Sequence, residues 1–143
     1  MRGTSTLKRT RLKKVSKTGT IKDRIQALLR KIGLALWGEK CAFALFQAET
    51  KRKCQPPLQY DHLEPRSINE LFADFLNGQI LCKIHNQWKH YHPREALRIE
   101  RKLYGDERMD ELARRSKLSK PMSKKDWLQV EAELELKVAE LER

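Results

Sequence analysis

Four potential metal ligands, Cys41, Cys54, Cys82 and His85, constrain the fold of this chain more than any other feature. Two residues separate Cys82 from His85, a spacing that lets one turn present two ligands to a tetrahedral zinc ion. Cys41 and Cys54 are the remaining cysteines, and they lie farther apart than the usual zinc-knuckle pair. A Cys₃His zinc site is therefore one interpretation, and three inert thiols with an exposed histidine is the other. If zinc binds, it should hold together a small core that apolar burial alone supports poorly.

The cysteine count favours metal binding over disulfides. Three cysteines cannot all pair within one chain. The sequence has no secretory signal and no apolar run near the roughly 20 residues that span a bilayer. We therefore expect a protein of the reducing cytoplasm, with no membrane partner. In that compartment, thiols near a histidine indicate metal binding before crosslinking.

The positive charge of the chain gathers at its beginning. The net charge is +12, and residues 1–31 hold eleven Lys and Arg against the single acid Asp23. Residues 32–143 are nearly balanced. We interpret residues 1–20 as a basic flexible arm that neutralises nucleic-acid phosphates, and a solubilising tail is the alternative. The phosphate contacts expected in this arm are Arg9, Arg11, Lys13 and Lys14.

Apolar spacing predicts a mostly helical α+β protein. Ile21, Ile25, Leu28 and Leu29 begin a helical pattern over residues 21–37. Pro93 suits the first position of a helix that Gly105 would end, and a further helix is expected over residues 106–115. Ser123 and Asp126 have the spacing of a capping box that opens the last helix. Residues 39–60 predict an irregular β segment with a strand ending near His62, residues 69–75 a single helical turn, and Ile80 the start of another helix.

Asp61-His62, Asn77 and Asn86 form the pattern with the most chemical content. Carboxylate and amide oxygens suit a hard cation such as Mg²⁺, and a neutral imidazole can take a proton from water. In a strand, Asp61 and His62 point to opposite faces, so one can bind a metal while the other faces a phosphate. Taken singly, these residues are ordinary caps or buried polar groups. Taken together, they predict a one-metal site that cleaves phosphodiesters.

These residues resemble the HNH (ββα-metal) endonuclease motif. The strings are Asp61-His62-Leu-Glu-Pro-Arg-Ser and Asn77-Gly-Gln-Ile-Leu-Cys82-Lys-Ile-His85-Asn86-Gln-Trp-Lys89. Within that family the chain is most similar to the phage Rap (NinG) recombination nucleases, and it also resembles the recombination endonuclease VII type. The resemblance covers roughly residues 40–143. It implies a small ββα-metal core within residues 21–93, a C-terminal helical extension over residues 94–143, and branched DNA, such as a Holliday junction or flap, as substrate.

The resemblance also implies a role for each residue of the pattern. His62 would be the general base, Asp61 and Asn86 the ligands of a catalytic Mg²⁺ or Mn²⁺, and Asn77 the residue that fixes the intervening loop. Cys41, Cys54, Cys82 and His85 fall on the positions that bind structural zinc in the family. Arg66 and Lys89 are expected to hold a DNA phosphate, or else to be ordinary surface charges.

Two alternatives remain open at this level. A non-catalytic, zinc-stabilised nucleic-acid-binding protein would have the same fold without the chemistry. Symmetric cutting of paired strands would need a homodimer, and the last helix, with Trp127, Val130 and Leu134 on one seam, is one place to build it. Such a seam is more often a packing face within one chain than a coiled-coil dimer contact.

Overall fold

The computed structural model describes residues 17–64, 69–118 and 120–143. The described part is mostly helical with one two-stranded antiparallel sheet, which confirms the α+β class. Five predicted DNA contacts lie outside the described residues: Arg9, Arg11, Lys13, Lys14 and Arg66.

The helices are named in chain order. They are α2 (Lys17–Trp37), α3 (Gln47–Thr50), α4 (Lys83–Tyr91), α5 (Pro93–Tyr104), α6 (Asp106–Leu118) and α7 (Lys124–Leu141). Short 3₁₀ turns occur at η1 (Ala44–Phe46), η2 (Glu70–Ala73) and η3 (Phe75–Asn77). The strands are β1 (Leu58–His62) and β2 (Gly78–Cys82).

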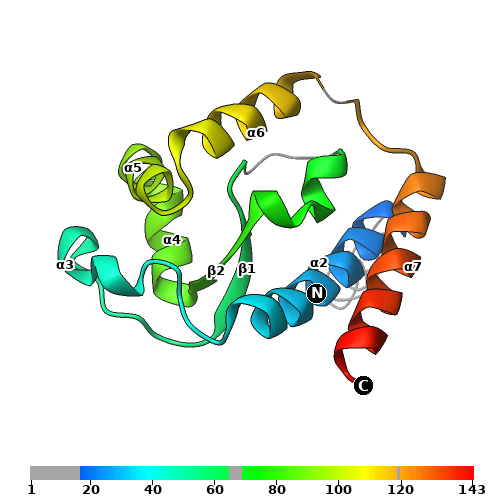
Figure 1. Ribbon diagram of the computed structural model, residues 1–143, viewed down its shortest axis with the longest axis horizontal. Helices are drawn as coiled ribbons and strands as arrows, with labels where there is room; N and C mark the ends of the chain where they lie inside the picture. Colours follow the sequence, from blue (N-terminus) through cyan, green and yellow to red (C-terminus); the bar gives the residue numbers. More distant parts are fainter. Residues whose placement is uncertain (1–16, 65–68, 119) are drawn as a thin grey trace, which may run out of the picture.

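The small sheet lies between two groups of helices (Figure 1). Its register pairs Tyr60 with Ile80 and His62 with Gly78. Because side chains alternate along a strand, Tyr60 and Ile80 pack toward α2 and α7, while Leu81 packs toward α4 and α5. Both faces of the hairpin are therefore covered.

Helices α2 and α7 pack side by side and run in the same direction. The Lys22 ammonium lies over the Trp127 ring, 5.1 Å from its centroid, and the Arg24 guanidinium pairs with the Glu131 carboxylate further along. Trp127 and Leu134 are buried in this contact with Ile25 and neighbouring residues of α2. The predicted seam of the last helix is thus a packing face within the chain.

One predicted element is wrong, and another is confirmed only in part, since β1 ends at His62 as expected. Residues 78–82 form strand β2, and the helix expected from Ile80 begins only at Lys83. A short apolar run carries no periodicity that separates strand from helix, and pairing with β1 decides the outcome here. The β segment expected over residues 39–60 is a strand only from Leu58, because residues 44–50 form η1 and α3 instead.

The other predicted helix signals are confirmed. Pro93 opens α5, and Gly105, at a φ of 90° that disfavours other residues, ends it. Ser123 and Asp126 make the reciprocal hydrogen bonds of a capping box at the start of α7. Within the described residues, none of the helices has the length and apolar character needed to cross a membrane.

Candidate metal centre and the end of strand β1

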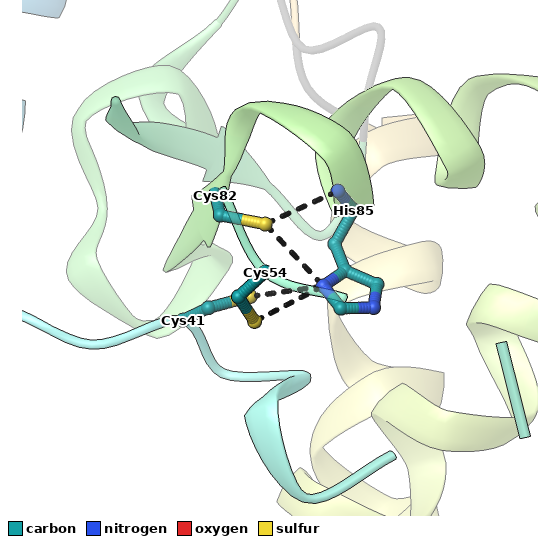
Figure 2. Close-up of side chains that lie close together, drawn as sticks. All are labelled: Cys41, Cys54, Cys82 and His85. Atoms are coloured by element: carbon teal, nitrogen blue, oxygen red, sulfur yellow. Dashed lines mark hydrogen bonds between the residues drawn. The ribbon is translucent and has the colours of Figure 1, made fainter. Parts of the chain in front are cut away.

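Cys41, Cys54, Cys82 and His85 come together from four separate places in the fold. Cys41 follows α2, Cys54 precedes β1, Cys82 ends β2, and His85 lies in the first turn of α4. Figure 2 shows the three sulfur atoms gathered around the His85 Nδ1 atom. The Sγ–Nδ1 distances are 3.5 Å for Cys41 and 3.4 Å for both Cys54 and Cys82.

These distances fit the edges of a tetrahedral zinc site. With zinc–sulfur bonds of about 2.3 Å and zinc–nitrogen bonds of about 2.0–2.1 Å, the sulfur–nitrogen edge of a tetrahedron is about 3.5 Å. All four ligand atoms lie within 4.8 Å of one another. The cluster could therefore hold a structural metal such as Zn²⁺, as the sequence predicted.

Backbone and side-chain donors prepare these ligands for a cation. The Phe43 amide donates to the Cys41 sulfur at 3.4 Å, and the His85 amide donates to the Cys82 sulfur at 3.3 Å. The His85 Nε2 atom lies 2.9 Å from the Thr50 hydroxyl oxygen, and that hydroxyl in turn reaches backbone carbonyls. Because a carbonyl can only accept, Thr50 donates to it and accepts from Nε2, which leaves the Nδ1 lone pair for a metal.

The pKa values of the four groups shift in different directions. Burial raises the pKa of the Cys41 thiol to about 12, and burial also raises the pKa of the Cys54 thiol. Burial opposes ionisation of Cys82 as well, but hydrogen bonds from the His85 and Gln55 backbones bring its pKa below the usual value. Burial and the nearby Arg52 lower the pKa of His85, so its ring is neutral and able to bind a metal.

Asp61 lies in a largely buried polar network rather than in an open site. Its Oδ2 atom accepts from the Gln79 amide at 2.9 Å and from the Lys89 ammonium at 2.7 Å. Lys89 also lies 2.7 Å from the Glu100 Oε2 atom and 3.0 Å from the His62 carbonyl oxygen. We call Asp61, Gln79, Lys89 and Glu100 the Asp61 network.

The Asp61 network carries one excess negative charge, because two carboxylates face a single ammonium. The side chains of Asp61, Lys89 and Glu100 are 14%, 12% and 2% exposed. Burial lowers the pKa of Lys89, but the two carboxylates outweigh it and raise that pKa, so the ammonium stays charged. Burial raises the pKa of Glu100, and the Lys89 ammonium opposes this effect. Lys89 is thus held inside the protein, which differs from the surface position expected for a phosphate contact.

His62 occupies the opposite face of β1. Its Nε2 atom lies 2.8 Å from the Phe72 carbonyl oxygen, and its ring stacks on the Phe72 ring at 4.5 Å. Since the carbonyl can only accept, Nε2 carries the proton and Nδ1 keeps its lone pair. Burial lowers the pKa of His62 and favours this neutral form. The ring is therefore fixed in the tautomer that a base at Nδ1 would need.

Asn77 ties the loop between the strands to the end of β1. Its Oδ1 atom accepts from the Glu64 amide at 2.7 Å, and its Nδ2 atom donates to the Leu71 carbonyl oxygen at 3.1 Å. Its side chain is fully buried. This is the loop-fixing arrangement that the sequence predicted for Asn77.

Asn86 faces β1 one helical turn before Lys89. Its amide nitrogen donates to the Gln59 side-chain oxygen at 2.7 Å, whereas the Asp61 carboxylate is bonded to Lys89 and Gln79. Within the described residues, Asp61 and Asn86 share no hydrogen-bonding partner. Asp61 and Asn86 lie on facing elements as predicted, and their convergence on one ion stays a prediction.

Sequence reasoning missed Gln79, Glu100, Tyr104 and Thr50. The Tyr104 hydroxyl donates to Gln79 at 2.8 Å, and this bond orients the Gln79 amide toward Asp61. Glu100 carried a usable signal, because it follows Ala96 and Ile99 at the spacing of one helical face and both are buried. An acid on a core-facing stripe indicates a buried partner. Thr50 and Tyr104 carried no comparable signal.

Comparisons of this chain with protein-family models, with curated proteins and with solved structures found no match.

Proposed function

We propose that this chain is a metal-dependent DNA endonuclease of the HNH class, acting on branched recombination intermediates such as Holliday junctions or flaps. The observation that carries the proposal is the state of His62 at the end of β1. Its Nε2 proton is held by the Phe72 carbonyl oxygen at 2.8 Å, and its Nδ1 lone pair is left to accept a proton. This fixed, neutral tautomer and the Asp61 carboxylate on the opposite face of β1 together supply the base and the metal ligand that the proposed reaction needs.

The arrangement around His62 supports the same proposal. A two-stranded antiparallel hairpin is followed at once by α4, which packs against it and presents Asn86 toward β1. The Cys₃His cluster joins the end of β2 to the first turn of α4, so a zinc ion there would fix the helix on the hairpin. This is the order of elements that a ββα-metal core requires.

The donors near Asp61 suit a catalytic Mg²⁺ or Mn²⁺. Asp61 and Asn86 each have a side-chain Oδ1 atom that accepts no hydrogen bond from the described residues. The excess negative charge of the Asp61 network favours a cation. Bound there, the metal would act as a Lewis acid that stabilises charge on the phosphate and on the leaving 3′ oxygen.

The chain's own residues perform the proton transfer in this proposal. His62 takes a proton from water at Nδ1, the water oxygen attacks the phosphorus atom, and the bond from phosphorus to the 3′ oxygen breaks. The leaving 3′ oxygen takes up a proton from solvent. The products are a 5′ phosphate and a 3′ hydroxyl. Asn77 acts indirectly, because its hydrogen bonds hold the loop that carries the Phe72 carbonyl. The basic residues 1–31 would add electrostatic affinity for the phosphate backbone.

A second candidate function is a zinc-stabilised nucleic-acid-binding protein without catalysis. The observation that favours it is the Lys89 ammonium, which already satisfies the Asp61 carboxylate at 2.7 Å. A binding protein would need neither a metal at Asp61 nor a base at His62.

Cleavage assays with zinc-loaded protein distinguish the two functions. Wild type is incubated with a four-way junction, a flap and a linear duplex, with and without added Mg²⁺. We expect Mg²⁺-dependent cutting, and a loss of about 10²–10⁴-fold for His62→Ala, as for removal of a general base. His90→Ala is the control, because His90 is an exposed histidine of α4 outside the site. Binding without cutting would favour the second candidate, and equal cutting by wild type and His62→Ala would contradict the role of His62.

A further inference from the structure

We infer that Lys89 is a tethered cation that competes with the divalent metal for Asp61, and that Glu100 is the positioning residue that holds its ammonium when the metal binds. The inference rests on the proposed function, since it takes Asp61 to be a metal ligand. It assigns a role to Lys89, which was expected at the surface, and to Glu100, which the sequence analysis did not single out.

The ammonium of Lys89 occupies a position that a metal ion would also favour. Three oxygen atoms surround it: Asp61 Oδ2 at 2.7 Å, Glu100 Oε2 at 2.7 Å and the His62 carbonyl at 3.0 Å. Carboxylate and carbonyl oxygens are also the preferred ligands of hard divalent cations. The Asp61 carboxylate that would bind the metal is therefore already paired, through its Oδ2 atom, with a charge of this chain.

Glu100 gives the ammonium somewhere to stay when Asp61 is taken. Glu100 is 2% exposed and accepts from both Lys89 and the Gln79 amide at 2.7 Å. Because Lys89 touches both carboxylates at once, it can release Asp61 and keep Glu100 by a small rotation of its side chain. An ammonium with no second carboxylate would instead have to leave its buried position or remain beside the incoming metal.

The charge balance gives each residue a distinct effect. With Lys89 in place, the Asp61 network as a whole holds one excess negative charge. A divalent ion at Asp61 would nevertheless bind at short range from the positive charge of the Lys89 ammonium. Removing the ammonium removes that repulsion. Removing the Glu100 charge leaves Lys89 with Asp61 as its one carboxylate and strengthens the competitor. Removing both leaves the excess charge of the network unchanged but eliminates the tethered cation.

The double variant that lacks both the Lys89 and the Glu100 charges makes the test specific. We would measure Mn²⁺ binding to zinc-loaded, full-length protein by the electron paramagnetic resonance signal of free Mn²⁺, without DNA. The variants are Lys89→Met with Glu100→Gln as a pair, and Glu100→Gln alone. Lys83→Met is the control, because Lys83 is an exposed lysine of the same helix and lies outside the network. Asp61→Asn tests the proposed metal ligand itself, and thermal melting checks the folding of each variant.

We expect the paired variant to bind Mn²⁺ at least about tenfold more tightly than wild type, because it removes the ammonium bonded to the Asp61 carboxylate and leaves the net charge of the network unchanged. Glu100→Gln alone should bind several-fold more weakly, and this single isosteric change keeps the test decisive if the pair does not fold. Lys83→Met should match wild type.

Two results would overturn the inference, and they have different consequences. If the paired variant and Glu100→Gln bind like wild type while Asp61→Asn loses binding, Lys89 does not compete and the proposed function still stands. If neither wild type nor the paired variant binds Mn²⁺ and wild type cuts none of the DNA substrates, the proposed function fails and the inference fails with it.

Discussion

Removing the metal from the Cys₃His cluster should unfold the part of the protein around α4. The ligands come from three stretches of chain that only the folded structure brings together, and they are surrounded by the buried residues Phe43, Leu81 and Trp88. Without a cation, the thiols and the imidazole would be buried in a core that offers them few partners. A metal bound there would therefore contribute to folding directly, since the site does not exist in the unfolded chain.

The size of the effect follows from this coupling. A structural zinc ion contributes about 10–16 kcal/mol in small zinc-dependent folds, against a net stability of about 5–15 kcal/mol for a typical domain. Even a loss of about 5 kcal/mol would lower the melting temperature by roughly 15 °C in a chain of this length. The second core, formed by Ile25, Leu29 and Trp127 between α2 and α7, does not include the metal ligands. That pair of helices should retain more structure than the region around α4.

The assay compares zinc-loaded and chelator-treated protein by circular dichroism melting, after metal analysis of the purified protein. We expect one zinc ion per chain and a large fall in melting temperature after its removal. Thr50→Val is the graded variant, because it removes the hydroxyl bonded to the His85 Nε2 atom at 2.9 Å and leaves the ligands intact. It should weaken zinc binding about 10–100-fold. A metal-free protein that melts at the temperature of the untreated protein would refute the reasoning.

Three further predictions concern other parts of the molecule. Gly78→Ala should cost about 1–3 kcal/mol or more, because its Cβ would lie 1.8 Å from the Tyr60 hydroxyl oxygen. Tyr60→Phe removes a buried hydroxyl that has no hydrogen-bond partner among the described residues, so it should not destabilise the protein and should partly rescue Gly78→Ala. Destabilisation by Tyr60→Phe of more than about 1 kcal/mol in chemical denaturation would contradict this. Nitrogen-15 NMR at pH 7 should find the His62 ring neutral with its proton on Nε2, since burial lowers the pKa of His62 and the Phe72 carbonyl accepts from Nε2. A proton on Nδ1 would exclude Nδ1 of His62 as the proposed base. Deleting residues 2–16, which include six Lys and Arg, should reduce the slope of log affinity for DNA against log salt concentration by up to about 5. An unchanged slope would show that these residues contact no phosphates.

Much of the candidate site could be predicted because its residues carry local signals. Cys82 and His85 have the spacing of a metal-binding turn, and Asp61-His62 stands at the end of a strand. Asn77 was expected to fix the loop, and the structure gives it hydrogen bonds to Glu64 and Leu71. The first two inferences depend on neighbours within a few residues, where backbone geometry limits the possible arrangements. The role of Asn77 followed from the resemblance, because Glu64 lies 13 residues away in the chain.

The less successful predictions depended on residues far apart in the chain. The run from Gly78 to Cys82 became a strand because β1 pairs with it, and an apolar run of that length has no period of its own. Lys89 was expected to face DNA but lies against Asp61 and Glu100, one on a strand and one on the next helix. A lysine gives no local sign of whether two carboxylates will meet it.

The sequence by itself determined the helical class, the helix boundaries at Pro93, Gly105 and Ser123, and the Cys82–His85 pair of the cluster that could hold a metal, because spacing and caps act within a turn or two. Only the tertiary structure decided which charge lies on Asp61, which carbonyl sets the tautomer of His62, and that Asn86 is bonded to Gln59. Those outcomes depend on how β1, α4, α5 and the η2 turn pack against one another. Packing of distant elements is a property of the whole core, and local patterns do not encode it.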